Sequence, residues 1–316
     1  MTVTRYCILT GLAALAVAVA VHPAAAQRDR DRDRSRDEYA TRLDTTVALD
    51  RDGLVELAIT SGSIIVTGWD RGEVRVRAFS ERGTIDFAAT SSRVALDARP
   101  RGGRMGDTHY EITMPVGARL QMRSISGELS ARGVRGEVDA RSTSGEIEIA
   151  DVTRAMAATV SGSVRMLRVE GNVRVSTISG EVELQRVTGD VEAGTVSGEI
   201  AVSEARSRYV RAQTTSGSIS FDGTVDPAGR YQFGSHSGSV HLTLPDSVGA
   251  TLGVETFSGE IDSDFPMTLM PGERLSSTHG RRFEFKLGDG RARISAGTFS
   301  GEIQIERGGG RAKREE

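Results

Sequence analysis

The sequence predicts an all-β fold, a single-stranded β-solenoid (β-helix) with about 18–21 residues in each coil. The first observation is a repeat: Ser-Gly-Glu or Ser-Gly-Ser occurs ten times, and from Ser126 to Ser258 the copies are 17 to 21 residues apart. The second is composition, because 37 of the 316 residues are glycine and only 5% are aromatic, which favours a thin interior of small aliphatic side chains. The alternative is an antiparallel β-meander folded into a sandwich.

The residues around each Ser-Gly pair repeat as well. The third and fifth residues after the serine are mostly aliphatic, as at Ile147 and Ile149. Because side chains alternate across a strand, these positions are expected to point inward, and the serine and the Glu or Ser two residues later to face solvent. The residue before the serine is Thr, Ile, Val or Phe in nine copies and His236 in the tenth. It shares the inward parity, so His236 is expected to be a hydrogen-bonded core residue.

Further glycines indicate two strands and two corners in each coil. Gly136, Gly171 and Gly189 each lie nine residues from a Ser-Gly glycine, and glycine suits a corner because it has no Cβ to clash. Two lead-in segments, near residues 114–123 and 244–255, share Val-Gly-Ala-x-Leu after a proline. They are expected to open a block of 18-residue repeats and a block of 21-residue repeats.

The step from Ser258 to Ser300 is twice 21 residues long, and His279-Gly280-Arg281 lies halfway along it. We interpret this tripeptide as a degenerate copy of the repeat. Phe283 and Phe285 are one residue out of parity with the other copies, so a bulge or a looser corner is expected there.

Four regions are expected along the chain. Residues 1–26 have a basic start, an apolar run and a small-residue exit, which is typical of a signal peptide. Residues 27–42 alternate Arg and Asp and are expected to be a disordered tether. Residues 43–305 are expected to form the β-repeat domain, and residues 306–316 a disordered tail. The protein is therefore predicted to be exported to the periplasm, the cell surface or the medium, with no membrane span after cleavage.

The composition also limits the partners. The single cysteine, Cys7, lies in the predicted signal peptide, so no disulfide is expected after cleavage. The net charge of −3 offers no electrostatic footprint for nucleic acid, and none is predicted as a partner.

The chain resembles the exported bacterial β-strand-repeat proteins described as candidate adhesins, whose domain is otherwise of unknown function. The residues that carry the resemblance are Ser61–Asp70 with Glu73–Val76, the serial Ser-Gly-Glu copies and the two Val-Gly-Ala-x-Leu segments. It covers roughly residues 43–305 and implies a β-helical fold and an envelope or secreted location. It implies no catalytic residues and no cofactor.

The candidate site on the surface is a column of four glutamates, Glu128, Glu146, Glu181 and Glu199, which the repeat is expected to stack on one face. Such a column could hold Ca²⁺ through oxygen ligands. The Gly-Gly-x-Gly-x-Asp repeat of calcium-binding β-helices does not occur in the sequence. We therefore predict no metal, cofactor or catalytic residue, and interpret the glutamates as a solvated surface column.

The predicted function is that of a non-enzymatic, adhesin-like surface or envelope element, binding an envelope polymer or protein or serving a structural role. One alternative is a polysaccharide-active β-helix enzyme, which would need loops that wall a cleft, and the spacing of the copies leaves no room for them. The other is an envelope-stress scaffold with no small ligand. Trp69, in Thr67-Gly68-Trp69-Asp70, is expected to cap the first coil rather than stack on a sugar.

Overall fold

The computed structural model describes residues 40–101, 106–266 and 281–308. The chain divides into two units, Met1–Glu38 and Tyr39–Glu316, and all of the described residues lie in the second. The expected signal peptide, most of the tether and most of the tail lie outside the described residues. The first strand begins at Thr41, two residues before the expected start of the repeat domain. Among the described residues there is no helix long and apolar enough to cross a membrane.

The described residues of the second unit form 24 strands in two layers that face each other across one core. In order of hydrogen-bonded neighbours, the first layer is β1 (Thr41–Ala48), β3 (Glu73–Ser80), β6 (Thr108–Pro115), the second half of β2 (Leu54–Trp69), the second half of β7 (Arg119–Arg132), β9 (Ile147–Val152), β11 (Val164–Val169), β13 (Val182–Val187), β15 (Ile200–Ala205), β17 (Ile219–Gly223), β19 (Val240–Leu244), β24 (Ile303–Arg307) and β21 (Ile261–Ser263).

The second layer is built in the same way from the other half of each coil. Its order is β4 (Thr84–Ala89), β5 (Arg93–Arg99), the first half of β2, the first half of β7, β8 (Glu137–Ser142), β10 (Arg154–Ala158), β12 (Val173–Ser176), β14 (Val191–Gly194), β16 (Tyr209–Ser216), β18 (Arg230–Ser237), β23 (Ala292–Ser300), β20 (Ala250–Ser258) and β22 (Arg281–Leu287).

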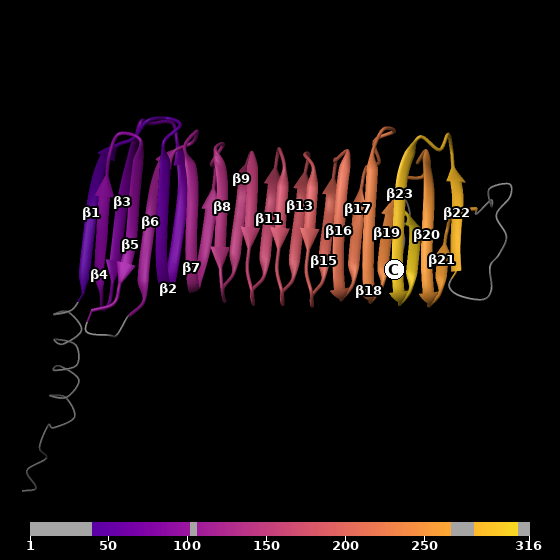
Figure 1. Ribbon diagram of the computed structural model, residues 1–316. Helices are drawn as coiled ribbons and strands as arrows, with labels where there is room; N and C mark the ends of the chain where they lie inside the picture. The colour runs from indigo at the N-terminus through magenta and orange to yellow at the C-terminus, as the bar shows by residue number, and fades with distance from the viewer. Residues whose placement is uncertain (1–39, 102–105, 267–280, 309–316) are drawn as a thin grey trace, which may run out of the picture. The chain divides into compact units, whose positions relative to one another are not determined.

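The predicted solenoid is confirmed. Every pair of neighbouring strands from β7 to β20 is parallel, and each coil contributes one strand to each layer (Figure 1). Parallel neighbours throughout this region exclude the antiparallel sandwich. Antiparallel pairs occur at the two ends of the stack, where β1, β3 and β4 lie at one end and β22 at the other.

The order of the coils in space differs from their order in the sequence at both ends. The coil β23–β24 lies between the coils β18–β19 and β20–β21, so the yellow β23 in Figure 1 stands among orange strands. Likewise, β2 lies between the coil β5–β6 and β7. At the C-terminal end the chain therefore forms the outer coil β20–β21 before the inner coil β23–β24, and at the N-terminal end it forms the inner strand β2 before the outer coil β5–β6.

The prediction that His279-Gly280-Arg281 marks a further coil of the repeat is wrong. His279 and Gly280 lie outside the described residues, and Arg281 begins β22, which runs antiparallel to β20. A strand running the other way presents its side chains in another register. The reversed direction of β22, and not the expected bulge, explains why Phe283 and Phe285 are out of parity with the repeat.

The cap expected at Trp69 is also wrong. The strand of Trp69 is flanked by β6 and β7, so this residue does not lie at an end of the stack. Its indole nitrogen donates a hydrogen bond to the Glu73 carbonyl at 2.7 Å, and the Arg71 guanidinium lies 4.9 Å from the centre of the ring. Trp69 thus fastens the turn between β2 and β3.

The interior is a narrow column of Val, Ile, Leu, Met and Ala side chains, as the composition predicts. Of the six buried aromatic rings in the described residues, three lie in the coils of 21 residues. Phe221 packs against Phe233 and Tyr231, with ring centres 5.1 and 5.9 Å apart, and the Tyr231 hydroxyl donates to the Ser207 carbonyl at 2.7 Å. The longer coils therefore enclose a wider core.

The two lead-in segments form similar turns. The amide of Ala118 donates to the Pro115 carbonyl, and the amide of Val248 donates to the Pro245 carbonyl, each at 3.0 Å. Each turn opens a strand of the second layer, β7 or β20.

Candidate functional site

The Ser-Gly copies form one continuous column along a corner of the stack. Backbone bridges and strand registers place each copy beside the next. In spatial order the serines are Ser61, Ser126, Ser144, Ser161, Ser179, Ser197, Ser216, Ser237, Ser300 and Ser258. Nine of them are exposed, as predicted, and Ser61 is half-buried.

The close approach of neighbouring coils explains why glycine follows each serine. A Cβ placed on Gly180 would lie 2.0 Å from the carbonyl oxygen of Gly162, and one on Gly198 would lie 2.0 Å from that of Gly180. The same contact, at 1.9 to 2.3 Å, recurs from Gly145 to the last coil. The backbones of successive coils touch at this corner, so no side chain fits there.

The corner interrupts the alternation of side chains. The residue two before the serine is a buried Ser or Thr in nine of the ten copies, as at Thr177, and in those copies the next two residues are exposed. The expectation that the residue before the serine points inward is therefore wrong. Alternation holds within a straight strand, whereas here the chain bends from one layer to the other.

The residues before the serines form an exposed line that we call the apolar row. In spatial order it contains Ile125, Thr143, Val160, Ile178, Val196, Thr215, His236, Phe299 and Phe257. Six of the seven large apolar side chains that are exposed in the described part of the chain belong to it, each between 43% and 54% exposed. Exposed apolar residues scattered singly over a surface are normal, whereas these six lie along one line.

His236 lies in the apolar row and is exposed, so the expected core role is wrong. Its ring stacks on Phe299 with centres 4.9 Å apart, and Phe299 stacks on Phe257 at 4.7 Å with an angle of 4° between the rings. The ring faces are thus largely used within the stack, and the ring edges face outward.

Beside the apolar row runs a second line, which we call the acidic row. It consists of the residues two after each serine from Ser126 onward. In spatial order they are Glu128, Glu146, Ser163, Glu181, Glu199, Ser218, Ser239, Glu302 and Glu260. The four glutamates expected in one column do lie on it, in two pairs of neighbours with Ser163 between the pairs.

The acidic row is poorly neutralised. All six of its glutamates are exposed, and Glu146 is the one with an ion pair among the described residues, to Arg165 at 3.3 Å. No group of three or more His, Cys, Asp or Glu side chains in the described ranges is arranged to hold a metal ion. We call the apolar row, the serines and the acidic row together the corner surface.

The opposite corner carries a charged groove of about 790 Å³. Four non-glycine residues on successive coils have left-handed backbones there, at φ 52 to 58°: Asp151, Arg168, Arg186 and Glu204. Each stands seven residues after its serine, where the preceding coil has Gly133 at φ 72°. Sequence reasoning missed this row, whose signal was a charged residue at that position in four consecutive repeats.

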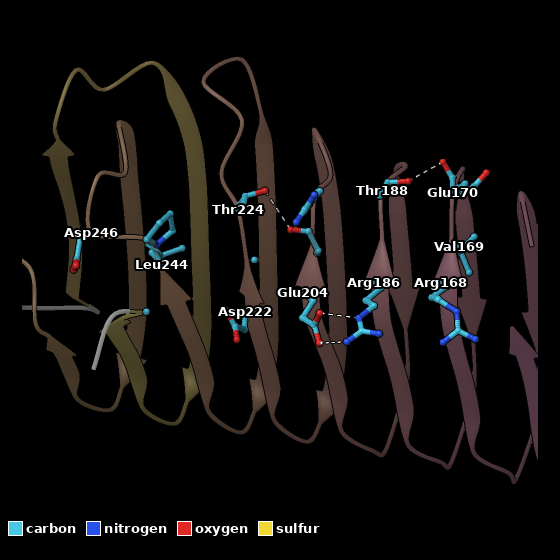
Figure 2. A pocket seen from close by; sticks show the side chains of 15 residues that line it. Arg168, Val169, Glu170, Arg186, Thr188, Glu204, Asp222, Thr224, Leu244 and Asp246 are labelled. Carbon is cyan, nitrogen blue, oxygen red and sulfur yellow. Dashed lines mark hydrogen bonds and ion pairs between the residues drawn. The ribbon is translucent and has the colours of Figure 1, made fainter. Parts of the chain in front are cut away.

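Two ion pairs join neighbouring coils at this corner. Arg168 donates to Asp151 at 2.8 Å and Arg186 donates to Glu204 at 2.8 Å, and Figure 2 shows the second pair joined across neighbouring strands. The hydrogen bond from Arg168 lowers the pKa of Asp151, and that from Arg186 lowers the pKa of Glu204. Both carboxylates are therefore ionised and neutralised near pH 7.

The other two histidines of the described residues, His109 and His241, do not lie together in a site. His109 contacts Ser63, with 3.0 Å from its Nδ1 to the serine Oγ, and His241 contacts Gln304 at 3.0 Å. In the described residues, neither ring has a carboxylate hydrogen-bond partner that would complete a catalytic triad.

Residues 171–306 match the family model described as Toastrack DUF4097. The match confirms the resemblance predicted from the repeated Ser-Gly-Glu copies. The matched segment contains the corner surface from Ser179 onward, and much of the groove.

Two solved structures are similar over most of their length. A candidate cell adhesion protein from Clostridium sporogenes shares 11% identity over 84% of this chain and 100% of its own, with a TM-score of 0.24. A candidate adhesin from Bacteroides fragilis shares 11% identity over 84% of this chain and 97% of its own, with a TM-score of 0.41. At these values neither structure carries an argument about function. No curated protein matches the chain.

Proposed function

We propose that this protein is an exported, non-enzymatic, adhesin-like element of the cell surface or envelope, which acts by binding a partner along its corner surface. The observation that carries the proposal is the apolar row, where six large side chains are each about half exposed in a single line. Coils about 4.8 Å apart make the nine positions of this row roughly 40 Å long. An exposed apolar patch of several hundred Å² is typical of an interaction site.

The charged groove supports a binding role better than an enzymatic one. A glycosidase needs a general acid with a raised pKa, held near a second carboxylate. Glu204 and Asp151 are instead paired with arginines that lower their pKa. These two carboxylates therefore link neighbouring coils through ion pairs and do not have the character of a general acid.

The test is a pull-down with the purified exported chain against envelope extracts and glycans. The row variant Ile178→Ser/Val196→Ser removes apolar side chains that are 51% and 47% exposed, so the fold is expected to persist. The matched control is Ile65→Ser, because Ile65 is 50% exposed on β2 and lies outside the row. We expect the wild type and the control to retain a partner that the row variant loses. Retention by none of the three, or equally by all, would contradict the proposal.

A further inference from the structure

The corner surface is amphipathic in a particular way. The apolar row and the acidic row run in parallel, three residues apart in every coil, with the exposed serines between them. Three pairs of glutamates stand on neighbouring coils: Glu128 with Glu146, Glu181 with Glu199, and Glu302 with Glu260. Like charges on adjacent strands repel, so the free surface favours a cationic partner.

A second copy of the chain fits this surface poorly. Two copies related by a two-fold axis can meet at the corner surface in two orientations. If the stacks run antiparallel, the acidic row meets the acidic row of the other copy. If they run parallel, the acidic row meets the apolar row. Either arrangement buries unpaired carboxylates, which disfavours association.

A sugar polymer also fits poorly. Sugars bind aromatic side chains through the ring face, but Phe299 lies between His236 and Phe257 at stacking distance on both sides. The rest of the row consists of Ile, Val and Thr side chains, which offer apolar contact without a flat face. The corner surface therefore matches a polypeptide that carries both apolar and basic side chains.

We propose, resting on the function proposed above, that the corner surface binds a cationic amphipathic polypeptide segment. Apolar side chains of the segment lie on the apolar row, and its Lys or Arg side chains lie along the acidic row. Ile125 to Val196 spans four coil steps, roughly 19 Å, which corresponds to about 13 residues of helix. One turn of helix rises about 5.4 Å, close to the coil spacing, so successive turns meet successive coils.

The test uses a synthetic helical peptide with a stripe of Leu flanked by Lys, and a matched peptide with Glu in place of every Lys. Binding to the full exported chain is measured by fluorescence anisotropy at two salt concentrations. The acidic-row variant is Glu181→Gln/Glu199→Gln. Its control, Glu137→Gln/Glu170→Gln, removes two exposed negative charges away from the corner surface. The row variant Ile178→Ser/Val196→Ser is measured as well.

We expect the Lys peptide to bind the wild type and the control alike, and each of the two corner variants about tenfold more weakly, with weaker binding in higher salt. If the acidic-row variant and its control lose the same affinity for the Lys peptide, the net charge of the chain explains the binding, and the proposal is overturned. Equal binding of the Glu peptide, no binding of the Lys peptide, row-dependent capture of a glycan, or dimerisation that the row variant abolishes would also overturn it. The pull-down separates the two proposals. If it retains a partner that the row variant loses, and the peptide experiment gives any of these results, the proposed binding function still holds and the proposal of a cationic segment is wrong.

Discussion

Gly180→Ala is expected to destabilise the chain by about 3 kcal/mol. The added methyl group would meet the Gly162 carbonyl oxygen at 2.0 Å, and both atoms belong to backbones held by the parallel coils. Neither coil can move without breaking its contacts with the next one, so the strain is not relieved locally. Urea unfolding followed by far-UV circular dichroism measures the effect.

The matched control is Gly234→Ala. Gly234 lies in β18, and a Cβ placed there has no atom within 4 Å. Alanine at that position is expected to be neutral, or to stabilise the chain by up to about 1 kcal/mol by restricting the unfolded state. If the two alanine variants unfold at the same urea concentration, the proposed close contact between coils is wrong.

Phe221→Ala is expected to destabilise the chain by about 3–5 kcal/mol. Phe221 is 2% exposed and packs against Phe233 and Tyr231 in the widest part of the core. The side chains around it belong to stacked parallel strands and cannot collapse into the cavity. The same urea experiment measures the loss.

Phe257→Ala is the comparison for this prediction. Phe257 is 52% exposed in the apolar row, and its main contact is the stacked ring of Phe299. We expect its removal to cost about 1 kcal/mol or less. A cost for Phe257→Ala as large as that for Phe221→Ala would mean that the apolar row holds the fold together rather than being free to bind.

Much of the fold could be predicted because stacked coils need the same residue types at equivalent positions, and the repeat shows those positions. Ile147, Ile149 and their equivalents repeat with the coil, so their inward direction and the coil length follow from one pattern. Glu128, Glu146, Glu181 and Glu199 follow from the same spacing, and they lie on one line.

The spatial order of the coils could not be predicted. A repeat shows that coils are equivalent, but equivalence does not say which coils are neighbours. The step of 42 residues before Ser300 was the sign that the repeat is interrupted before the last coil. The structure places Ser300 between Ser237 and Ser258.

The main surface of the candidate site was also missed, for a local reason. His236 and Ile178 have the parity of core residues, but the glycine corner that follows them ends the alternation. Two residues before the serine, Thr177 is the buried residue, and its hydroxyl has no hydrogen-bond partner among the described residues. An apolar residue beside a Ser-Gly corner therefore has to be considered as a surface residue.

All ten copies form one continuous column, with the last coil of the sequence inserted before the end. Engineered disulfides test it directly, in a Cys7→Ser background that has no other thiol. Ser237→Cys/Ser300→Cys places the thiols on neighbouring strands about 4.8 Å apart, within reach of a disulfide. Ser237→Cys/Ser258→Cys places them two strands apart, roughly 10 Å, which is too far.

The measurement is the free-thiol content after mild oxidation of the folded chain. We expect the Ser237→Cys/Ser300→Cys chain to lose both thiols to an internal disulfide, and the Ser237→Cys/Ser258→Cys chain to keep them. The reverse result would show that the coils stack in sequence order, and would contradict the corner surface as described.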